Sequence, residues 1–177
     1  MFDFEEQLAV GQKGELLVRK YYESQLDEGK TKFIVRDAKE EEQKKGADFF
    51  IINNELGHRY VEVKTDTRAE STGNVALEIQ IVYGDTKRKS IGCALKTFPD
   101  FLFYWIYPTN QLLYWNPDEL IPYIMDWVIE GKYRIVDAEN KNFFSRSLIV
   151  PIEDLLATNV VRSINVSYHL LDSLETS

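Results

Sequence analysis

A predicted β-hairpin in the first third of the chain constrains the fold more than any other feature. Residues 47–52 and 59–65 are two apolar, strand-like runs, and the turn-like segment Asn53-Asn54-Glu55-Leu56-Gly57 joins them. Side chains alternate between the two faces of a strand. Glu62 and Lys64 should therefore project from one face, while the valines beside them point into a core.

The register of this hairpin decides whether Asp48 reaches Glu62. A loop of residues 54–56 puts Asp48 directly opposite Glu62, with Cβ atoms about 5 Å apart. A loop of residues 55–57 puts Asp48 opposite Lys64 and diagonal to Glu62, at about 7 Å, and gives Gly57 the left-handed position that such loops favour. A shift of one residue would send the two acids to opposite faces.

Two carboxylates this close predict a cation site. They repel each other, so that one takes up a proton unless a cation lies nearby. Carboxylate oxygens suit Mg²⁺ or Mn²⁺. The Lys64 ammonium cannot bind metal, but it can hold an attacking water or offset charge on a phosphate, and a nearby metal should lower its pKa. This chemistry suits cleavage of a phosphodiester. The alternative is a surface cluster of ion pairs with little effect on stability.

A helix is predicted over residues 4–24. One stripe, spaced by four and three residues, would face inward. Within it Glu15 is a carboxylate where an apolar residue is expected, unless it lies at a partly exposed boundary. Gly11 and Gly14 each cost a helix roughly 1 kcal/mol relative to alanine, which favours close approach of the helix to a sheet. The stripe comprises Phe4, Leu8, Gly11, Glu15, Val18 and Tyr22.

Composition narrows the class of protein. The 177 residues, 44% of them hydrophobic, suit one globular domain. One cysteine and two histidines argue against disulfides, thiolate metal clusters and a histidine-rich zinc site. The acidic N-terminus lacks the features of a secretory signal, so a cytoplasmic location is expected. The net charge of −8 argues against nucleic-acid binding by bulk positive charge, but allows an enzyme whose acids bind cations.

The remaining pattern predicts a mixed α/β (α+β) fold with a mixed central sheet. The apolar run 98–107 is too short to cross a membrane and indicates a buried strand. Asn116 and Pro117 mark the start of a helix that ends near Gly131. Residues 39–45 and 83–89 are expected to form polar loops. Further strands are predicted at 33–36, 75–82, 101–107, 111–115, 133–136 and 148–150, and a short helix at 152–157.

The hairpin and helix together resemble the PD-(D/E)XK nuclease superfamily, with its restriction-endonuclease-like and Holliday-junction-resolvase-like members. The resemblance rests on Gly46-Ala47-Asp48, on Glu62-Val63-Lys64, and on Gly11-Gln12-Lys13-Gly14-Glu15 in the preceding helix. It covers about residues 4–82, and Ala47 replaces the proline of the motif. It implies a single nuclease-like domain over residues 1–177: a mixed sheet of about four strands flanked by helices, with a core at about 4–107 and an α/β extension at about 108–177.

The resemblance also implies roles for individual residues. Asp48, Glu62 and the main-chain carbonyl of Val63 would bind Mg²⁺ or Mn²⁺. Lys64 would be the catalytic lysine, and Glu15 would complete a second metal site or orient water. The expected reaction is phosphodiester hydrolysis that leaves a 5′-phosphate.

The expected partner is DNA, RNA is not distinguished from it, and a homodimer that cuts two strands is plausible for this family. The alternative is a catalytically inactive module with the same fold that binds nucleic acid or protein. Candidate substrate-binding residues also have simpler explanations: packing for the tyrosine, a solvated face for the two residues of the next strand, and a charged turn for the basic run. These candidates are Tyr60, Glu78, Gln80, Lys87, Arg88 and Lys89.

Overall fold

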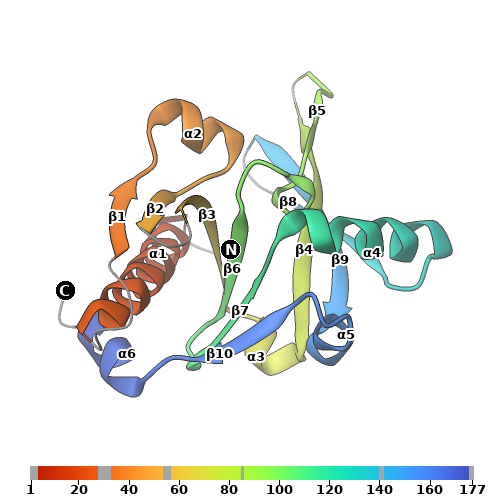
Figure 1. Ribbon diagram of the computed structural model, residues 1–177. Helices are drawn as coiled ribbons and strands as arrows, with labels where there is room; N and C mark the ends of the chain where they lie inside the picture. The colour runs from red at the N-terminus through yellow and green to blue at the C-terminus, as the bar shows by residue number, and fades with distance from the viewer. Residues whose placement is uncertain (1–3, 28–32, 54–56, 85, 140–141, 176–177) are drawn as a thin grey trace.

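The computed structural model describes residues 4–27, 33–53, 57–84, 86–139 and 142–175. Two β-sheets and the helices around them make up this part of the chain (Figure 1). The predicted α+β class is therefore confirmed. Among the described residues, no helix is both long and apolar enough to cross a membrane.

The first sheet has six strands and is mixed, as expected. Its order is β1-β2-β3-β6-β7-β10. Only β3 and β6 pair in parallel, and every other neighbouring pair is antiparallel. The strands are β1 (Phe33–Asp37), β2 (Phe49–Asn53), β3 (Gly57–Asp66), β6 (Phe101–Ile106), β7 (Gln111–Trp115) and β10 (Arg162–Asn165).

The second sheet has four antiparallel strands in the order β5-β4-β9-β8. Its two longest strands, β4 and β9, come from segments that lie about 60 residues apart in the chain. The connection from β3 to β6 passes through this sheet by way of β4 and β5. The strands are β4 (Asn74–Tyr83), β5 (Lys89–Ile91), β8 (Ile135–Glu139) and β9 (Phe143–Pro151).

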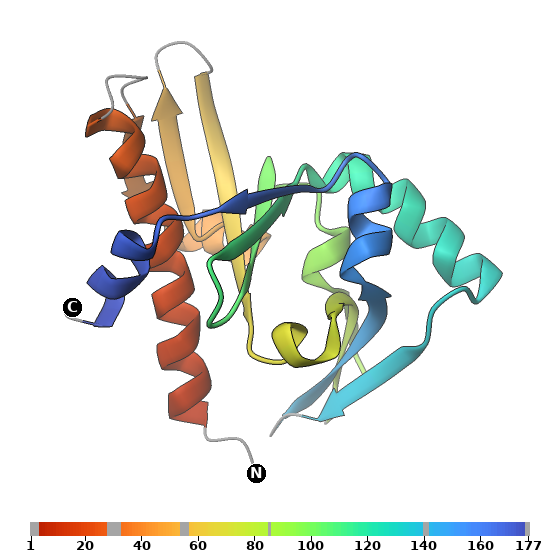
Figure 2. The ribbon, with the colours of Figure 1, turned by 90° about the horizontal axis from the view of Figure 1, so that it is seen from below.

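Two apolar cores result. Helix α1 (Phe4–Asp27) packs against one face of the first sheet, with α6 (Tyr168–Glu175) beside it (Figure 2). Leu17 and Val18 of α1 are fully buried there with residues of β2, β3 and β6. On the other face, Leu102 of β6 packs with Leu77 and Leu148 of the second sheet.

The remaining helices are α2 (Glu40–Lys45), α3 (Ala69–Thr72), the 3₁₀ turn η1 (Cys93–Leu95), α4 (Pro117–Glu130) and α5 (Ile152–Ala157). Two sequence predictions here are confirmed closely. The Asn116 side chain caps α4 by accepting a hydrogen bond from the Asp118 N–H at 2.9 Å, and Gly131 ends this helix with a φ of 64°. Helix α5 has the predicted bounds.

Several expectations about elements were wrong. Residues 40–45 form α2 instead of a loop, because Glu42 accepts a hydrogen bond from the Lys39 N–H and also pairs with Arg36. The segment 83–89 ends in β5. Strand β8 lies two residues later than predicted, and β9 is far longer. Elements α3, β10 and α6 were not predicted, and strand β2 begins at Phe49, one residue after Asp48.

The inward stripe predicted for α1 was only partly right. Val18 is buried, but Leu8 is 52% exposed and Glu15 also lies exposed. The side chain of Phe4 lies outside the described part. Gly14, one position before Glu15, makes the close approach: a Cβ there would lie 2.0 Å from Thr65 Oγ1 of β3. A Cβ on Gly11 would have no atom within 4 Å. Close approach to the sheet therefore explains the glycine at position 14 but not the one at position 11.

Candidate active site

The hairpin adopts the first of the two predicted registers. Phe49 pairs with Val61 and Asn53 with Gly57, and this register, continued by one residue, directs Asp48 toward Glu62. The alternative register, with Asp48 opposite Lys64, is wrong. Gly57 does have a positive φ of 73°, but it follows the loop instead of belonging to it. The loop residues 54–56 themselves lie outside the described part.

Asp48 lies just before β2 and is fixed to β3 by its backbone and by its side chain. Its N–H donates to the Val61 carbonyl at 2.7 Å, and its carbonyl accepts from the Ala38 N–H at 3.0 Å. Its Oδ2 accepts from the Val63 N–H at 2.7 Å. The Asp48 side chain thus takes the place of the next backbone partner of β3, which holds this carboxylate beside Glu62.

The main-chain carbonyl of Val63 faces the same place. In a strand, the N–H and C=O of one residue point toward the same neighbouring strand. The Val63 N–H points toward Asp48, where β2 has ended. Its carbonyl therefore also points toward the side of Asp48, as the resemblance implies.

Glu62 and Lys64 form a close ion pair within the molecule. Glu62 is 5% exposed, and its β6 neighbour Leu102 packs with residues of the second sheet. The Lys64 ammonium lies 2.6 Å from Glu62 Oε1, and its side chain remains 41% exposed. The pair therefore joins a buried carboxylate to a cation that solvent can still reach.

The close approach of Asp48, Glu62 and Lys64 shifts the pKa values of two of these groups. Burial and the neighbouring Glu62 raise the pKa of Asp48 to about 7. This agrees with the expectation that one of two close carboxylates takes up a proton. Burial lowers the pKa of Lys64, but Cys93, Glu62 and Asp48 raise it more, so the net shift is upward.

Glu15 reaches the edge of the same site from α1. Partial burial and the nearby Glu62 raise its pKa, while Lys64 acts in the opposite direction. The close packing of Gly14 on Thr65 explains this position, because it brings the middle of α1 against the strand that carries Glu62. Glu15 thus approaches the two acids without lying in the apolar interface.

Cys93 was not predicted as a site residue, yet several charged side chains lie near its thiol. Its thiol interacts with Lys64, Glu78, Glu62 and Lys96, and burial raises its pKa to about 12. The thiol is therefore protonated at neutral pH, when the carboxylates are the charged partners of Lys64. Glu78 Oε1 accepts from the Cys93 N–H at 3.3 Å, which brings the predicted Glu78 to this site.

The other candidate substrate-binding residues lie further out. Tyr60 shares the face of Glu62, but packs between the rings of Phe50 and Phe98, with centroid distances of 4.9 and 4.6 Å. Gln80 lies beyond a β-bulge that follows Glu78. Lys87, Arg88 and Lys89 are exposed on the β4–β5 hairpin, which projects at the top of Figure 1.

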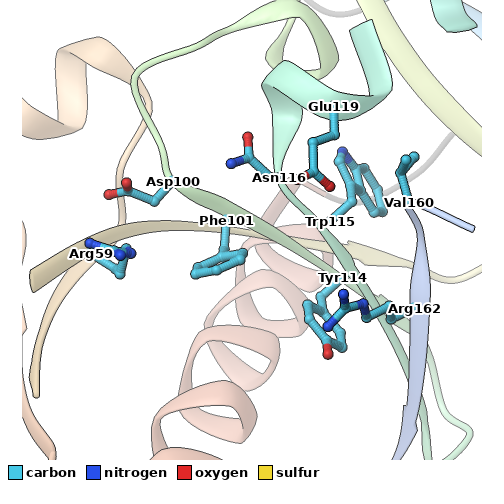
Figure 3. Close-up of a pocket in the computed structure, with 9 residues that line it drawn as sticks. All are labelled: Arg59, Asp100, Phe101, Tyr114, Trp115, Asn116, Glu119, Val160 and Arg162. Carbon is cyan, nitrogen blue, oxygen red and sulfur yellow. The ribbon is translucent and has the colours of Figure 1, made fainter. Parts of the chain in front are cut away.

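A cavity of about 440 Å³ lies apart from the acid pair, at the ends of β6 and β7 (Figure 3). Arg59, Asp100 and Arg162 bring both signs of charge to its wall. The Trp115 indole nitrogen is buried without a hydrogen-bond partner. Neither Asp48 nor Glu62 nor Lys64 lines this cavity, and its charges favour no particular ligand.

The donor groups at the acid pair fit a small divalent cation. Asp48 Oδ2 and Glu62 Oε1 are engaged by Val63 and Lys64, which leaves one further oxygen on each carboxylate. With the Val63 carbonyl, these are the hard oxygen donors that Mg²⁺ and Mn²⁺ take, usually together with waters. In the described part of the chain, no three His, Cys, Asp or Glu side chains lie close enough to surround a metal ion.

Comparison with known proteins adds no family to this picture. No protein-family model, no curated protein and no solved structure matches the chain.

Proposed function

We propose that this chain is a divalent-metal-dependent nuclease of the PD-(D/E)XK type that hydrolyses phosphodiester bonds in DNA. The observation that carries the proposal is the hairpin register, in which the Val63 N–H holds the Asp48 carboxylate beside Glu62. The same register leaves Lys64 on the face of Glu62, 2.6 Å from its carboxylate. A surface cluster of ion pairs would not require burial of Glu62 or a raised pKa at Asp48.

Asp48, Glu62 and the Val63 carbonyl would hold Mg²⁺ or Mn²⁺. The bound cation would supply charge neutralisation at the phosphate and a water of lowered pKa. Val63 can serve in this way because its carbonyl points past the end of β2. The hydrogen bond from the Val63 N–H fixes the Asp48 carboxylate, so this ligand needs little reorganisation.

Lys64 would act on the phosphate or on the attacking water. Its ammonium is held by Glu62 and stays charged, because Cys93, Glu62 and Asp48 raise its pKa more than burial lowers it. A charged donor aimed at the reacting phosphate offsets negative charge as it develops. Glu15, at the edge of the site, would orient a water or complete a second metal site.

DNA as substrate is part of the proposal, and RNA offers the same phosphodiester chemistry. The exposed basic residues on the β4–β5 hairpin would contact the backbone of either polymer. A homodimer would let two copies cut both strands of a duplex. Oligonucleotides of each kind, single-stranded and duplex, separate these substrates in one assay.

The first prediction concerns cleavage. With Mg²⁺ or Mn²⁺, the wild-type protein should cut plasmid or labelled oligonucleotide. Lys64→Ala and Asp48→Ala should each reduce the rate by a factor on the order of 100 or more, because each removes a group at the reacting phosphate. Matched controls are Lys132→Ala and Asp137→Ala, which change an exposed lysine and an exposed aspartate away from the acid pair. Equal activity in wild type, Lys64→Ala and Asp48→Ala would refute the proposal.

A second candidate function is a catalytically inactive module that binds nucleic acid or protein. The 2.6 Å pair between Lys64 and Glu62 favours it, because this pair neutralises the buried Glu62 charge without a metal. Calorimetry distinguishes the two candidates. Heat on addition of Mn²⁺ to wild type, absent in Asp48→Ala, supports the nuclease, whereas no heat with either protein supports the module.

A further inference from the structure

Lys96 is a second lysine near the acid pair, and its side chain lies over Gly46. Its side chain crosses directly over this glycine, which ends α2 with a φ of 102° and comes two residues before Asp48. A Cβ on Gly46 would lie 2.7 Å from Lys96 Cδ and 3.0 Å from its Nζ. The Lys96 ammonium is therefore held against the segment that leads into Asp48.

Lys96 follows the turn η1, whose first residue, Cys93, donates its N–H to Glu78 Oε1 at 3.3 Å. The charges that act on the Cys93 thiol include Lys64, Glu62 and Lys96, so the two lysines lie in the same part of the molecule. Unlike Lys64, Lys96 forms no ion pair and donates no side-chain hydrogen bond within the described part of the chain. The site thus contains one lysine neutralised by Glu62 and one cation still available for an anionic ligand.

The backbone that carries Lys96 is firmly attached to the second sheet. The Lys96 N–H donates to the Cys93 carbonyl at 3.2 Å, which closes the turn η1. Before this turn, the Gly92 N–H donates to the Ile79 carbonyl at 3.0 Å. Gly92 lies so close to β4 that a Cβ would be 2.2 Å from the Glu78 carbonyl oxygen. The Lys96 backbone is therefore fixed to the second sheet, while its side chain reaches across to Gly46 at the end of α2.

We propose that Lys96 is a phosphate-binding residue of this site, whose ammonium binds a non-bridging oxygen of the phosphodiester held at Asp48, Glu62 and Lys64. The inference rests on the proposed function and assigns a new residue to it. Lysine is well suited to the role, because its ammonium is a compact charge that binds phosphate without a fixed direction. The contact also explains why glycine suits position 46, since any larger residue would displace the Lys96 side chain.

The test measures binding of a labelled oligonucleotide at several salt concentrations. Ca²⁺ replaces Mg²⁺, and intact label at the end confirms that no cleavage occurred. Lys96→Met keeps an unbranched chain over Gly46 and removes only the charge. It should weaken binding about tenfold. It should also reduce the slope of log affinity against log salt by about 0.7 for a single strand or about 0.9 for duplex DNA.

Two further variants separate lost charge from damaged structure. Lys96→Arg should retain most of the affinity and the wild-type salt slope. Lys132→Met, an exposed lysine at the end of α4, should change neither quantity. Melting curves check that all variants fold. A Lys96→Met protein with wild-type affinity and wild-type slope overturns the inference.

Failure of this inference is distinguishable from failure of the proposed function. If wild type binds and cuts but Lys96→Met behaves identically, only the role of Lys96 is refuted. If wild type binds without cutting, the nuclease proposal fails while the salt slopes still test Lys96. If wild type binds no nucleic acid, the proposed function and the role of Lys96 are both refuted, and no variant is needed to show this.

Discussion

At the scale of single residues, Asp48 is a carboxylate whose charged form is disfavoured by its surroundings. It lies next to Glu62, and its pKa is raised to about 7 by burial and by that neighbour. An unfolded aspartate has a pKa of about 3.9. The folded protein therefore binds this proton more tightly than the unfolded chain does. The stability that the protonated group contributes is present at low pH and is lost as the pH rises from about 4 to about 7.

Asp48→Asn should consequently raise the melting temperature of the metal-free protein. The gain should be small at pH 4 and reach about 3 °C or more at pH 8, because the variant removes the charge and keeps an oxygen for the Val63 N–H. Scanning calorimetry across this pH range measures it. Saturating Mn²⁺ should shrink the difference, since the cation stabilises only wild type.

The matched control is Asp137→Asn. The hydrogen bond from Arg146 lowers the pKa of this exposed aspartate, so its charge is favourable and its removal should give no gain at pH 8. An Asp48→Asn variant no more stable than wild type at pH 8, without metal, would show that the Asp48 charge is not destabilised by burial and by Glu62.

At the scale of elements, the contact between α1 and β3 aligns the helix with the site. Gly14 lies against Thr65, whose hydroxyl is buried without a hydrogen-bond partner, and against Trp105. Glu15 follows directly. The interface therefore depends on one position without a side chain, and a change there moves the helix that carries Glu15.

Gly14→Ala and Gly11→Ala should have opposite effects on stability. Both replace a helical glycine and should gain up to about 1 kcal/mol of helix propensity. In Gly14→Ala this gain is outweighed by the collision with Thr65, and overpacking of this kind costs about 1–3 kcal/mol. Gly11→Ala meets no atom within 4 Å and should stabilise the protein. Urea unfolding measures both variants.

Thr65→Ala combined with Gly14→Ala supplies the control for this contact. Removing the Thr65 hydroxyl should restore part of the stability lost in Gly14→Ala, because the two atoms that collide are then no longer both present. Equal unfolding free energies for the two single glycine variants would contradict the assigned contact.

At the scale of the whole molecule, Tyr104 joins the two sheets beside the site. It is the β6 neighbour of Lys64 and is 5% exposed. Its hydroxyl donates to the Asp66 carboxylate at the end of β3 and accepts from the Ala76 N–H of β4 at 3.2 Å. This bridge helps to hold the second sheet over Glu62.

Tyr104→Phe should lower the free energy of unfolding by about 1–3 kcal/mol, since it leaves the Ala76 N–H without its partner. The control Tyr114→Phe removes a hydroxyl that forms no hydrogen bond within the described part, and should change stability little. Urea unfolding of both variants is the measurement. A Tyr104→Phe protein as stable as Tyr114→Phe would show that the bridge does not stabilise the pairing of the sheets.

Local pattern was enough to predict the hairpin, but not that the face of Glu62 would be buried. Alternation of side chains assigned Glu62 and Lys64 to one face, and two registers remained for Asp48. Only one is observed. Helix α4 was predictable because Asn116 and Gly131 are local start and stop signals. Helix α2 was missed because its charge run was interpreted as a loop, although Glu42 caps the helix at Lys39 and pairs with Arg36 of β1.

The sequence by itself determined the class of the fold, the face that Glu62 and Lys64 share, and the need for glycine near the sheet, because these follow from periodicity and backbone sterics. The tertiary structure alone decided what surrounds that face. The parallel contact of β3 with β6, and the packing of β6 on the second sheet, bury Glu62 and bring Cys93 near it, with Glu78 bonded to Cys93 and Lys96 lying over Gly46. These contacts join residues far apart in the chain, and no local periodicity encodes which of them meet.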